Sequence, residues 1–209
     1  MRHLGFQASL CVALLRGSSP SSQSARLKPL LADLGANRVS SVLKEGGCVS
    51  QLLVGVLSDT HGRLPEDAYA ELADCDFIIH AGDICGPGIM LERAVLGNND
   101  YPKYGESVGT VATPRIGGVR FLVTHTPTDL RAILSGRTNV LKPGDPVPQV
   151  AIHGHTHVPE LLRGSAASPA DVVLCPGSVT RPRGGSKRQL AKIAIENGAV
   201  KEIRFVELG

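Results

Sequence analysis

The sequence predicts an α/β fold in which short, buried strands and helices form layers. Two observations support this class. Short apolar segments such as Leu52–Leu57 are bounded by turn residues, as buried strands are, and segments with helical spacing lie between them. Hydrophobic residues make up 42% of the chain, which is a globular composition. In layered sheets of this kind, ligands bind at the ends of strands, so we expect the functional residues there.

The elements follow in order along the chain. Six predicted strands cover Leu52–Leu57, Asp76–His80, Ala94–Leu96, Val119–Thr124, Gln149–His153 and Asp171–Cys175. Helices are predicted at Pro65–Leu72, with proline in the first turn, and at Thr128–Leu134. A final hairpin is predicted from Leu190–Glu196 and Val200–Val206, because the Asn197-Gly198 pair between them favours a tight turn.

Size and charge narrow the classes of function. The 209 residues fit one domain with a full core plus an extension, and we place the domain at residues 51–209. Residues 1–50 carry a net charge of +4 and the remainder −1, so the domain itself has no basic excess for a nucleic-acid polymer. No apolar run approaches the ~18 residues of a membrane span. The five scattered cysteines form no CxxC pair, which favours a reducing compartment.

Residues 1–50 form an N-terminal extension rich in serine and arginine. Three interpretations compete: a disordered tail, a mitochondrial-type transit peptide, and a start site assigned too far upstream. A secretory signal is disfavoured because "ASLCVALL" lacks a clear cleavage site. We expect a cytoplasmic protein, with the mitochondrion as the alternative if the extension is a transit peptide.

Metal-ligand residue types follow five of the predicted strands. A lone histidine at a strand end is usually an ordinary polar residue, but a full set of carboxylates, imidazoles and an amide needs shared partners. Within two pairs the members stand two positions apart, which on an extended chain places them on one face. The set comprises Asp59, His61, Asp83, Asn98, His125, His155 and His157.

This oxygen and nitrogen ligand set, which has no thiolate, suits a hard or borderline metal such as Mn, Fe, Zn, Ni or Co. Seven ligands are too many for one ion and suit two ions if one carboxylate bridges them. Two adjacent metals lower the pKa of a bridging water and neutralise phosphate charge, which is the chemistry of phosphate-ester hydrolysis.

The ordered motifs Asp-x-His, Gly-Asp, Gly-Asn-x-Asp, His and Gly-His-Thr-His, which lie between Asp59 and His157, resemble those of the calcineurin-like metallophosphoesterases. The chain looks most similar to their small bacterial and archaeal phosphodiesterases, over about residues 52–209. The resemblance implies a four-layer α/β/β/α sandwich and attack of a metal-bridging hydroxide on a phosphate diester. It implies that Asp59, His61, Asp83 and His157 bind one metal, and that Asp83, which bridges, binds the second with Asn98, His125 and His155. Manganese is the first expectation, with nickel, iron, zinc, cobalt and magnesium as alternatives.

Several positions depart from the family pattern. Asn99 stands where many members have a histidine that protonates the leaving group, and an amide cannot supply that proton. We therefore expect better turnover of activated diesters, with Asn99 in contact with the substrate. Asp100 is a candidate to orient Asn98 or relay a proton, with a solvated turn residue as the alternative. Only 14 residues separate Asp83 from Asn98, which is short for a crossover with a helix.

The segment "CPGSVTRPRGG" resembles the family's Asn-Pro-Gly-Ser loop, with Cys175 in place of the asparagine. Ser178, Arg181 and Arg183 are candidates to contact a substrate phosphate, and a simple Pro/Gly turn with solvated arginines is the equal alternative. His80 and His153 stand on the alternate face and are expected to support the ligands or the core.

Three functions compete. The first is a two-metal phosphodiesterase acting on a small phosphate ester, with Asp59, His61, Asp83, Asn98 and Asp100 as catalytic residues. The second is a scaffold, because the retromer subunit of this fold binds partners instead; the complete ligand set favours the enzyme. A nuclease is third, since aromatic residues make up only 3% of the chain and offer few surfaces for base stacking. A homo-oligomer stays open.

Overall fold

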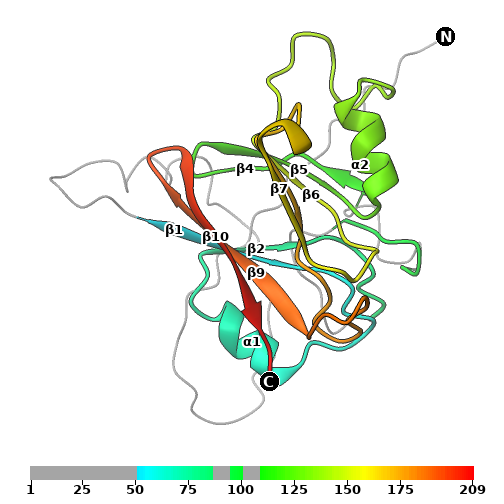
Figure 1. Ribbon diagram of the computed structural model, residues 1–209, viewed down its shortest axis with the longest axis vertical. Helices are drawn as coiled ribbons and strands as arrows, with labels where there is room; N and C mark the ends of the chain where they lie inside the picture. The colour runs from blue at the N-terminus through cyan, green and yellow to red at the C-terminus, as the bar shows by residue number, and fades with distance from the viewer. Residues whose placement is uncertain (1–50, 87–94, 101–108) are drawn as a thin grey trace, which may run out of the picture.

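The computed structural model describes residues 51–86, 95–100 and 109–209, which form two β-sheets and two α-helices (Figure 1). The first sheet has the strand order β10-β9-β1-β2. Its strands are β1 (Leu52–Leu57), β2 (Phe77–His80), β9 (Gln189–Glu196) and β10 (Ala199–Glu207). β1 pairs parallel with β2 and antiparallel with β9, so the sheet is mixed.

The second sheet has six strands, of which the central three, β5, β6 and β8, are parallel. The order is β3-β5-β6-β8-β7, and β4 also pairs with β5. The bounds are β3 (Val111–Ala112), β4 (Arg115–Ile116), β5 (Val119–Thr124), β6 (Val150–Ile152), β7 (Glu160–Arg163) and β8 (Val172–Cys175).

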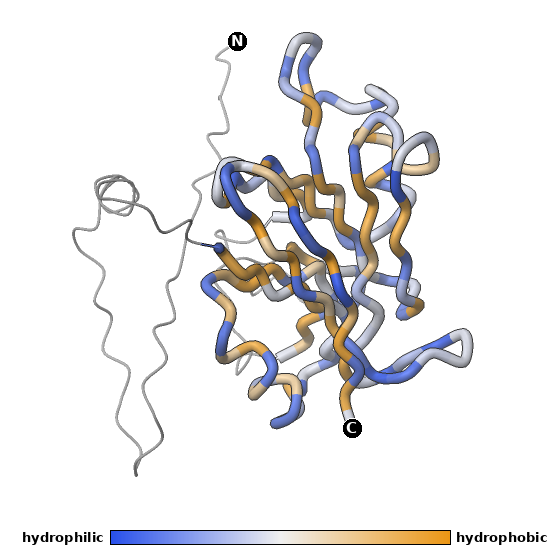
Figure 2. The backbone as a smooth tube through the Cα atoms, turned by 60° about the vertical axis from the view of Figure 1, so that its left-hand side comes forward, coloured by the Kyte–Doolittle hydropathy of each residue, from blue (hydrophilic) through white to orange (hydrophobic). Residues whose placement is uncertain are grey.

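The two sheets pack face to face, and one helix covers each outer face, which confirms the predicted four-layer order. Side chains from both sheets form the central core, among them Val54 and Val56 from β1 and Phe121 and Ile152 from the second sheet. Along the chain, hydrophobic residues concentrate in the strands (Figure 2). Burial of apolar surface on both faces explains why strands such as β1, β6 and β8 read as continuous apolar runs.

The outer layers are thin. Helix α1 (Glu66–Leu72) buries Ala68 and Leu72 in one cluster with Leu57 and Leu190 of the first sheet. Helix α2 (Pro127–Leu134) buries Leu130 and Ile133 against the second sheet, and Thr126 caps its first turn by accepting a hydrogen bond from the Asp129 amide. A short 3₁₀ helix follows β7 at Gly164–Ala166. Within the described ranges, no helix is long and apolar enough to cross a membrane.

Most predicted elements are confirmed within one or two residues, including the hairpin, whose Asn197 and Gly198 both have positive φ. The prediction of a strand at Ala94–Leu96 is wrong for the residues that the structure describes. Val95 donates a backbone hydrogen bond to His80 at 3.0 Å, but neither it nor Leu96 lies in a strand. Ala94 and the rest of the short crossover, residues 87–94, lie outside the described residues, as do residues 101–108 and the extension 1–50. The sequence reading also missed β3, β4 and β7, which are only two to four residues long.

Candidate metal centre

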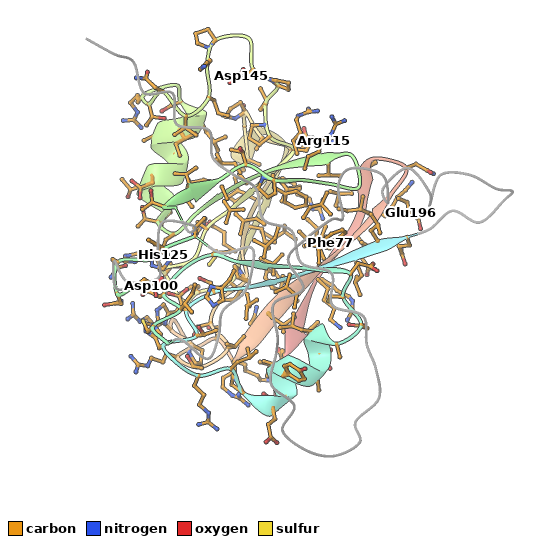
Figure 3. All side chains as sticks on the ribbon, turned by 180° about the vertical axis from the view of Figure 1, so that it is seen from behind. Phe77, Asp100, Arg115, His125, Asp145 and Glu196 are labelled. Atoms are coloured by element: carbon orange, nitrogen blue, oxygen red, sulfur yellow. The ribbon has the colours of Figure 1, made fainter. Side chains whose placement is uncertain are left out.

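The predicted ligands converge at one edge of the molecule, where β1, β2, β5 and β6 end. The side chains come from the loops that follow these strands, and from the loop that contains Asn98. Figure 3 shows His125 and Asp100 at this edge, with Glu196 at the opposite edge of the molecule. Because parallel strands end side by side, ligands that are far apart in the sequence, from Asp59 to His157, come together at this edge.

The backbone at this edge is unusual. Five candidate ligands have positive φ, a conformation that side chains other than glycine rarely adopt, and strain of this kind gathers at functional sites. They are Asp59 (55°), His61 (48°), Asp83 (56°), His155 (67°) and His157 (60°). The expectation that an extended strand aims both members of each pair is thus wrong: β1 ends at Leu57, and the left-handed turns that follow place the side chains.

Backbone hydrogen bonds between the loops after β1 and β2 hold these turns. The amides of Asp59 and His61 donate to the carbonyls of Gly82 and Asp83 at 2.9 and 3.0 Å. The Asp59 carbonyl accepts from the hydroxyls of Ser178 and Thr180, at 2.9 and 3.0 Å. The loop geometry is therefore determined by contacts from distant parts of the chain.

Two imidazoles are fixed in orientation by backbone carbonyls. Nδ1 of His125 lies 2.7 Å from the Ala81 carbonyl oxygen, and Nδ1 of His157 lies 2.6 Å from that of Arg181. A carbonyl can only accept, so each Nδ1 carries the proton and each Nε2 presents a lone pair. This arrangement, with the second ring nitrogen hydrogen-bonded behind the ligand atom, is typical of metal-binding histidines.

The first group of ligand atoms surrounds a carboxylate oxygen of Asp59. Oδ2 of this fully buried residue accepts from the Ser58 hydroxyl at 2.6 Å, but Oδ1 accepts no hydrogen bond in the described structure. Nε2 of His157 lies 3.1 Å from Oδ1, and Nε2 of His61 lies 3.3 Å from Nε2 of His157. The His157 lone pair thus faces a carboxylate oxygen and a second ring nitrogen, an arrangement that a cation between them would stabilise.

The second group surrounds Asp83 and Asn98. Oδ1 of Asp83 lies 3.5 Å from Nε2 of His125, whereas Oδ2 lies 4.0 Å from Nε2 of His61. Oδ1 of Asn98 lies 3.1 Å from Nε2 of His125 and 2.8 Å from Nδ1 of His155. The two oxygens of Asp83 therefore point to histidines of different groups.

The donor set fits divalent cations. Atoms of Asp59, His61 and His157 lie within 4.8 Å of one another, and so do atoms of Asp59, Asp83 and His125. By this measure Asp59 belongs to both groups, while Asp83 has one oxygen toward each. The orphaned Asp59 oxygen and the facing lone pairs are what a metal would satisfy. The assignment of the bridge to Asp83 stays a prediction.

Charge and burial keep the ligands in their binding forms. Burial, together with the Arg181 guanidinium, lowers the pKa of His61, so its imidazole is neutral near pH 7. Burial alone would raise the pKa of Asp83, but hydrogen bonds from Asn99 and the nearby imidazoles outweigh it and lower that pKa. A neutral imidazole and an ionised carboxylate are the forms that bind metals.

The remaining predicted residues lie around these groups. Ser178 is buried and donates to the Asp59 carbonyl, while its oxygen accepts from the Arg181 amide at 2.9 Å. The Arg181 and Arg183 side chains are exposed at the rim. Asn99 and Asp100 hydrogen-bond within the two ligand loops. The substrate contacts predicted for Asn99, Ser178, Arg181 and Arg183 stay predictions, as does the catalytic role of Asp100.

Sequence analysis missed two supporting residues, Thr60 and Gly154. Both stand next to predicted ligands in the sequence, and that position was the available signal. The Thr60 hydroxyl lies 3.0 Å from Nε2 of His80, beneath the site. Gly154 has no room for a side chain, because a Cβ there would collide with the Ser58 hydroxyl and lie 2.9 Å from Oδ2 of Asp59. The predicted supporting role of His80 agrees with this position.

Comparison with known sequences places the chain among the phosphoesterases. The family description "Calcineurin-like phosphoesterase superfamily domain" matches residues 52–198. A probable metallophosphoesterase of Methanothermobacter thermautotrophicus is 32% identical over 151 residues, 63% of this chain and 80% of the relative. A probable metallophosphoesterase of Methanocaldococcus jannaschii is 31% identical over 163 residues, 70% of this chain and 77% of the relative.

Solved structures share the fold at lower identity. A structure described as a novel archaeal phosphodiesterase aligns with TM-score 0.58 and 22% identity, covering 75% of this chain and all of that one. A predicted phosphoesterase of Streptococcus pneumoniae aligns with TM-score 0.55 and 20% identity, over 77% and 91%. Vacuolar protein sorting 29 of Cryptosporidium parvum aligns with TM-score 0.53 and 13% identity, over 75% and 98%.

Proposed function

The chain belongs to the calcineurin-like phosphoesterase superfamily, and we propose that it is a phosphodiesterase that uses two divalent metals to hydrolyse small phosphate diesters. Membership makes it a metallophosphoesterase, which acts on phosphate esters with metal ions. The number of metals, the diester preference and the residue roles are our proposal.

The observation that carries the proposal is the pair of ligand groups that meet at Asp83. One group would hold a metal with Asp59, His61 and His157, and the other with Asn98, His125 and His155, while each Asp83 oxygen lies toward a histidine of a different group. Metals bound there would supply positive charge for a phosphate and would lower the pKa of bound water.

The protein's own residues would orient the substrate. The Arg181 guanidinium lies near enough to His61 to lower the pKa of that imidazole, and its side chain is exposed at the rim. A planar guanidinium is suited to hold a phosphate oxygen in two-pronged contact. Arg183 is exposed two residues further along the same loop and would add positive charge at the entrance.

Protonation of the leaving group is the step to which Asn99 and Asp100 contribute least. The Asn99 amide donates to Asp83 and has no acidic proton for an alkoxide. The Asp100 carboxylate accepts two backbone hydrogen bonds, so both of its oxygens are engaged. We therefore propose that the preferred diesters have leaving groups that depart without protonation, such as aryl phosphates.

The nitrogen and oxygen ligands suit a hard or borderline divalent metal. We propose manganese, with nickel, iron, zinc, cobalt or magnesium as alternatives. Cys75, Cys85 and Cys175 are free thiols, which favours a reducing compartment, and we propose the cytoplasm.

A scaffold role is the second candidate, because a vacuolar protein sorting 29 shares this fold. That likeness, at 13% identity, concerns the fold alone. A scaffold has no need for a complete constellation of ligands, and we therefore favour the enzyme.

The deciding experiment is hydrolysis of bis(p-nitrophenyl) phosphate by metal-stripped protein after addition of manganese, nickel, zinc, magnesium or buffer alone. We expect turnover that requires metal and is abolished in Asp83→Ala, as in His61→Ala and His155→Ala. Asp145→Ala, at an exposed residue of the loop after α2, is the matched control and should keep full activity. Two tightly bound metals without turnover of this diester or of p-nitrophenyl phosphate would favour the scaffold, and full activity in Asp83→Ala would refute the bridging role.

A further inference from the structure

The predicted ligands Asp83 and Asn98 lie on two short segments, one on each side of the crossover. Hydrogen bonds of Asn99 and Asp100 join these two segments. The backbone amide of Asn99 donates to Oδ1 of Asp83 at 2.9 Å, and its side-chain amide donates to Oδ2 at 2.6 Å. One residue thus engages both oxygens of the carboxylate that faces both histidine groups. Charge-assisted hydrogen bonds of this length are among the stronger ones in proteins.

Asp100 ties the same two segments through the backbone. Its Oδ1 accepts from the Cys85 amide at 2.7 Å, and its Oδ2 accepts from the Gly97 amide at 2.8 Å. Gly97 approaches so closely that a Cβ there would collide with Asp83. The segment around Asn98 is therefore held against the Asp83 loop on both sides of the ligand.

We infer that Asn99 and Asp100 are positioning residues that form a clamp: they fix the distance between the Asp83 carboxylate and the Asn98 amide, and thereby the affinity and spacing of the two metals. The inference rests on the proposed two-metal function and deepens it. It replaces contact with substrate as the main role of Asn99, and proton relay as that of Asp100. Figure 3 shows Asp100 and the ligand His125 at the same edge of the molecule.

The clamp matters because the described contacts of the Asn98 side chain are with the other ligands His125 and His155. The Asn98 side chain is exposed, and it contacts both histidines through a single oxygen. Without the two hydrogen bonds that Asn99 donates and the two that the Asp100 carboxylate accepts, this segment would depend on described contacts such as the 3.0 Å bond from the Val95 amide to the His80 carbonyl. Loss of one such supporting contact typically weakens metal binding by about 10- to 100-fold.

The test is manganese titration of the metal-stripped full chain, with binding measured by calorimetry and magnetic coupling by electron paramagnetic resonance. Asn99→Ala should weaken the second manganese by about tenfold or more and reduce the coupled dimanganese signal. At low manganese its kcat should fall, and excess manganese should restore it. Asn139→Ala, at an exposed asparagine on the loop after α2, is the matched control and should behave as the unaltered chain does.

The outcomes separate the clamp from the proposed function. If the unaltered chain binds fewer than two manganese ions, the proposed function fails. If it binds two, and Asn99→Ala raises KM while both affinities and the coupling stay unchanged, Asn99 contacts substrate and the clamp is refuted. Asp100→Asn keeps the size of the side chain and loses one acceptor oxygen, so it should also weaken the second manganese. Unchanged metal binding in Asp100→Asn would refute the role of Asp100.

Discussion

We predict that His80 makes the metal-free protein lose stability as the pH falls below its unfolded pKa. His80 is completely buried beneath the site. Its Nδ1 accepts from the Gly82 amide at 3.2 Å, so its Nε2 carries the proton and donates to the Thr60 hydroxyl at 3.0 Å. Burial lowers the pKa of His80 from 6.5 to about 3, because a charged ring would be desolvated and would lose the Gly82 bond.

The magnitude follows from proton linkage. The unfolded chain binds a proton on this residue below pH 6.5, while the folded chain binds it only near pH 3, so lowering the pH through this window favours unfolding. The free energy of unfolding should fall by about 3 kcal/mol in total between pH 6.5 and about pH 4.5. Above pH 6.5 the contribution should be constant.

The assay is urea unfolding of the metal-free chain, in chelator, at about pH 7, pH 5.5 and pH 4.5, beside His80→Gln. Other titrating groups affect both proteins alike, so the gap between their unfolding free energies isolates His80. This gap should narrow by about 1 kcal/mol at about pH 5.5 and by about 3 kcal/mol at about pH 4.5. A gap independent of pH, or an NMR titration in which the His80 ring protonates near pH 6, would refute the reasoning.

Three further predictions concern the site and the domain. Gly154→Ala should destabilise the fold by about 1–3 kcal/mol and weaken metal binding, because the new methyl group collides with Ser58 and crowds Asp59. Urea unfolding and calorimetry measure the two effects, and Gly109→Ala, where a Cβ would meet no atom nearer than 3.5 Å and φ is not positive, is the control. Diester hydrolysis should slow steeply as the leaving group becomes more basic, measured with a series of substituted phenyl esters, and a flat dependence would point to a proton donor that we have not identified. Removal of residues 1–48 should leave turnover of bis(p-nitrophenyl) phosphate unchanged, since the described domain begins after them; a large loss would place the extension in the working domain.

Much of the fold was predictable because burial leaves a local pattern. β1 is apolar on both faces and β5 is apolar except at Arg120 and Thr124, and both were bounded correctly. The Asn197-Gly198 turn identified the hairpin of β9 and β10. β4 and β7 were not predictable, because their few residues have no period and pair only once the central strands are in place. The predicted strand at Ala94–Leu96 failed for the described residues: Val95 is apolar and buried, yet it makes a single pairing with His80.

The ligands were predictable as a set because chemistry limits which residues bind a metal. Their orientation was not, since it depends on backbone conformation and on distant partners. His157 is oriented by the Arg181 carbonyl, and Asp59 by hydroxyls from the loop after β8. Sequence spacing carries no information about such contacts.

The sequence by itself determined which residues can form a buried layered sheet and which chemistry its strand ends can support, because hydrophobic pattern and ligand type are properties of the residues themselves. The tertiary structure decided the rest: left-handed turns aim Asp59, His61 and Asp83, and hydrogen bonds join Asn99 and Asp100 to the loop that carries Asp83. The physical reason is that side-chain direction and hydrogen-bond partners arise only when distant segments pack, and a linear pattern does not contain those distances.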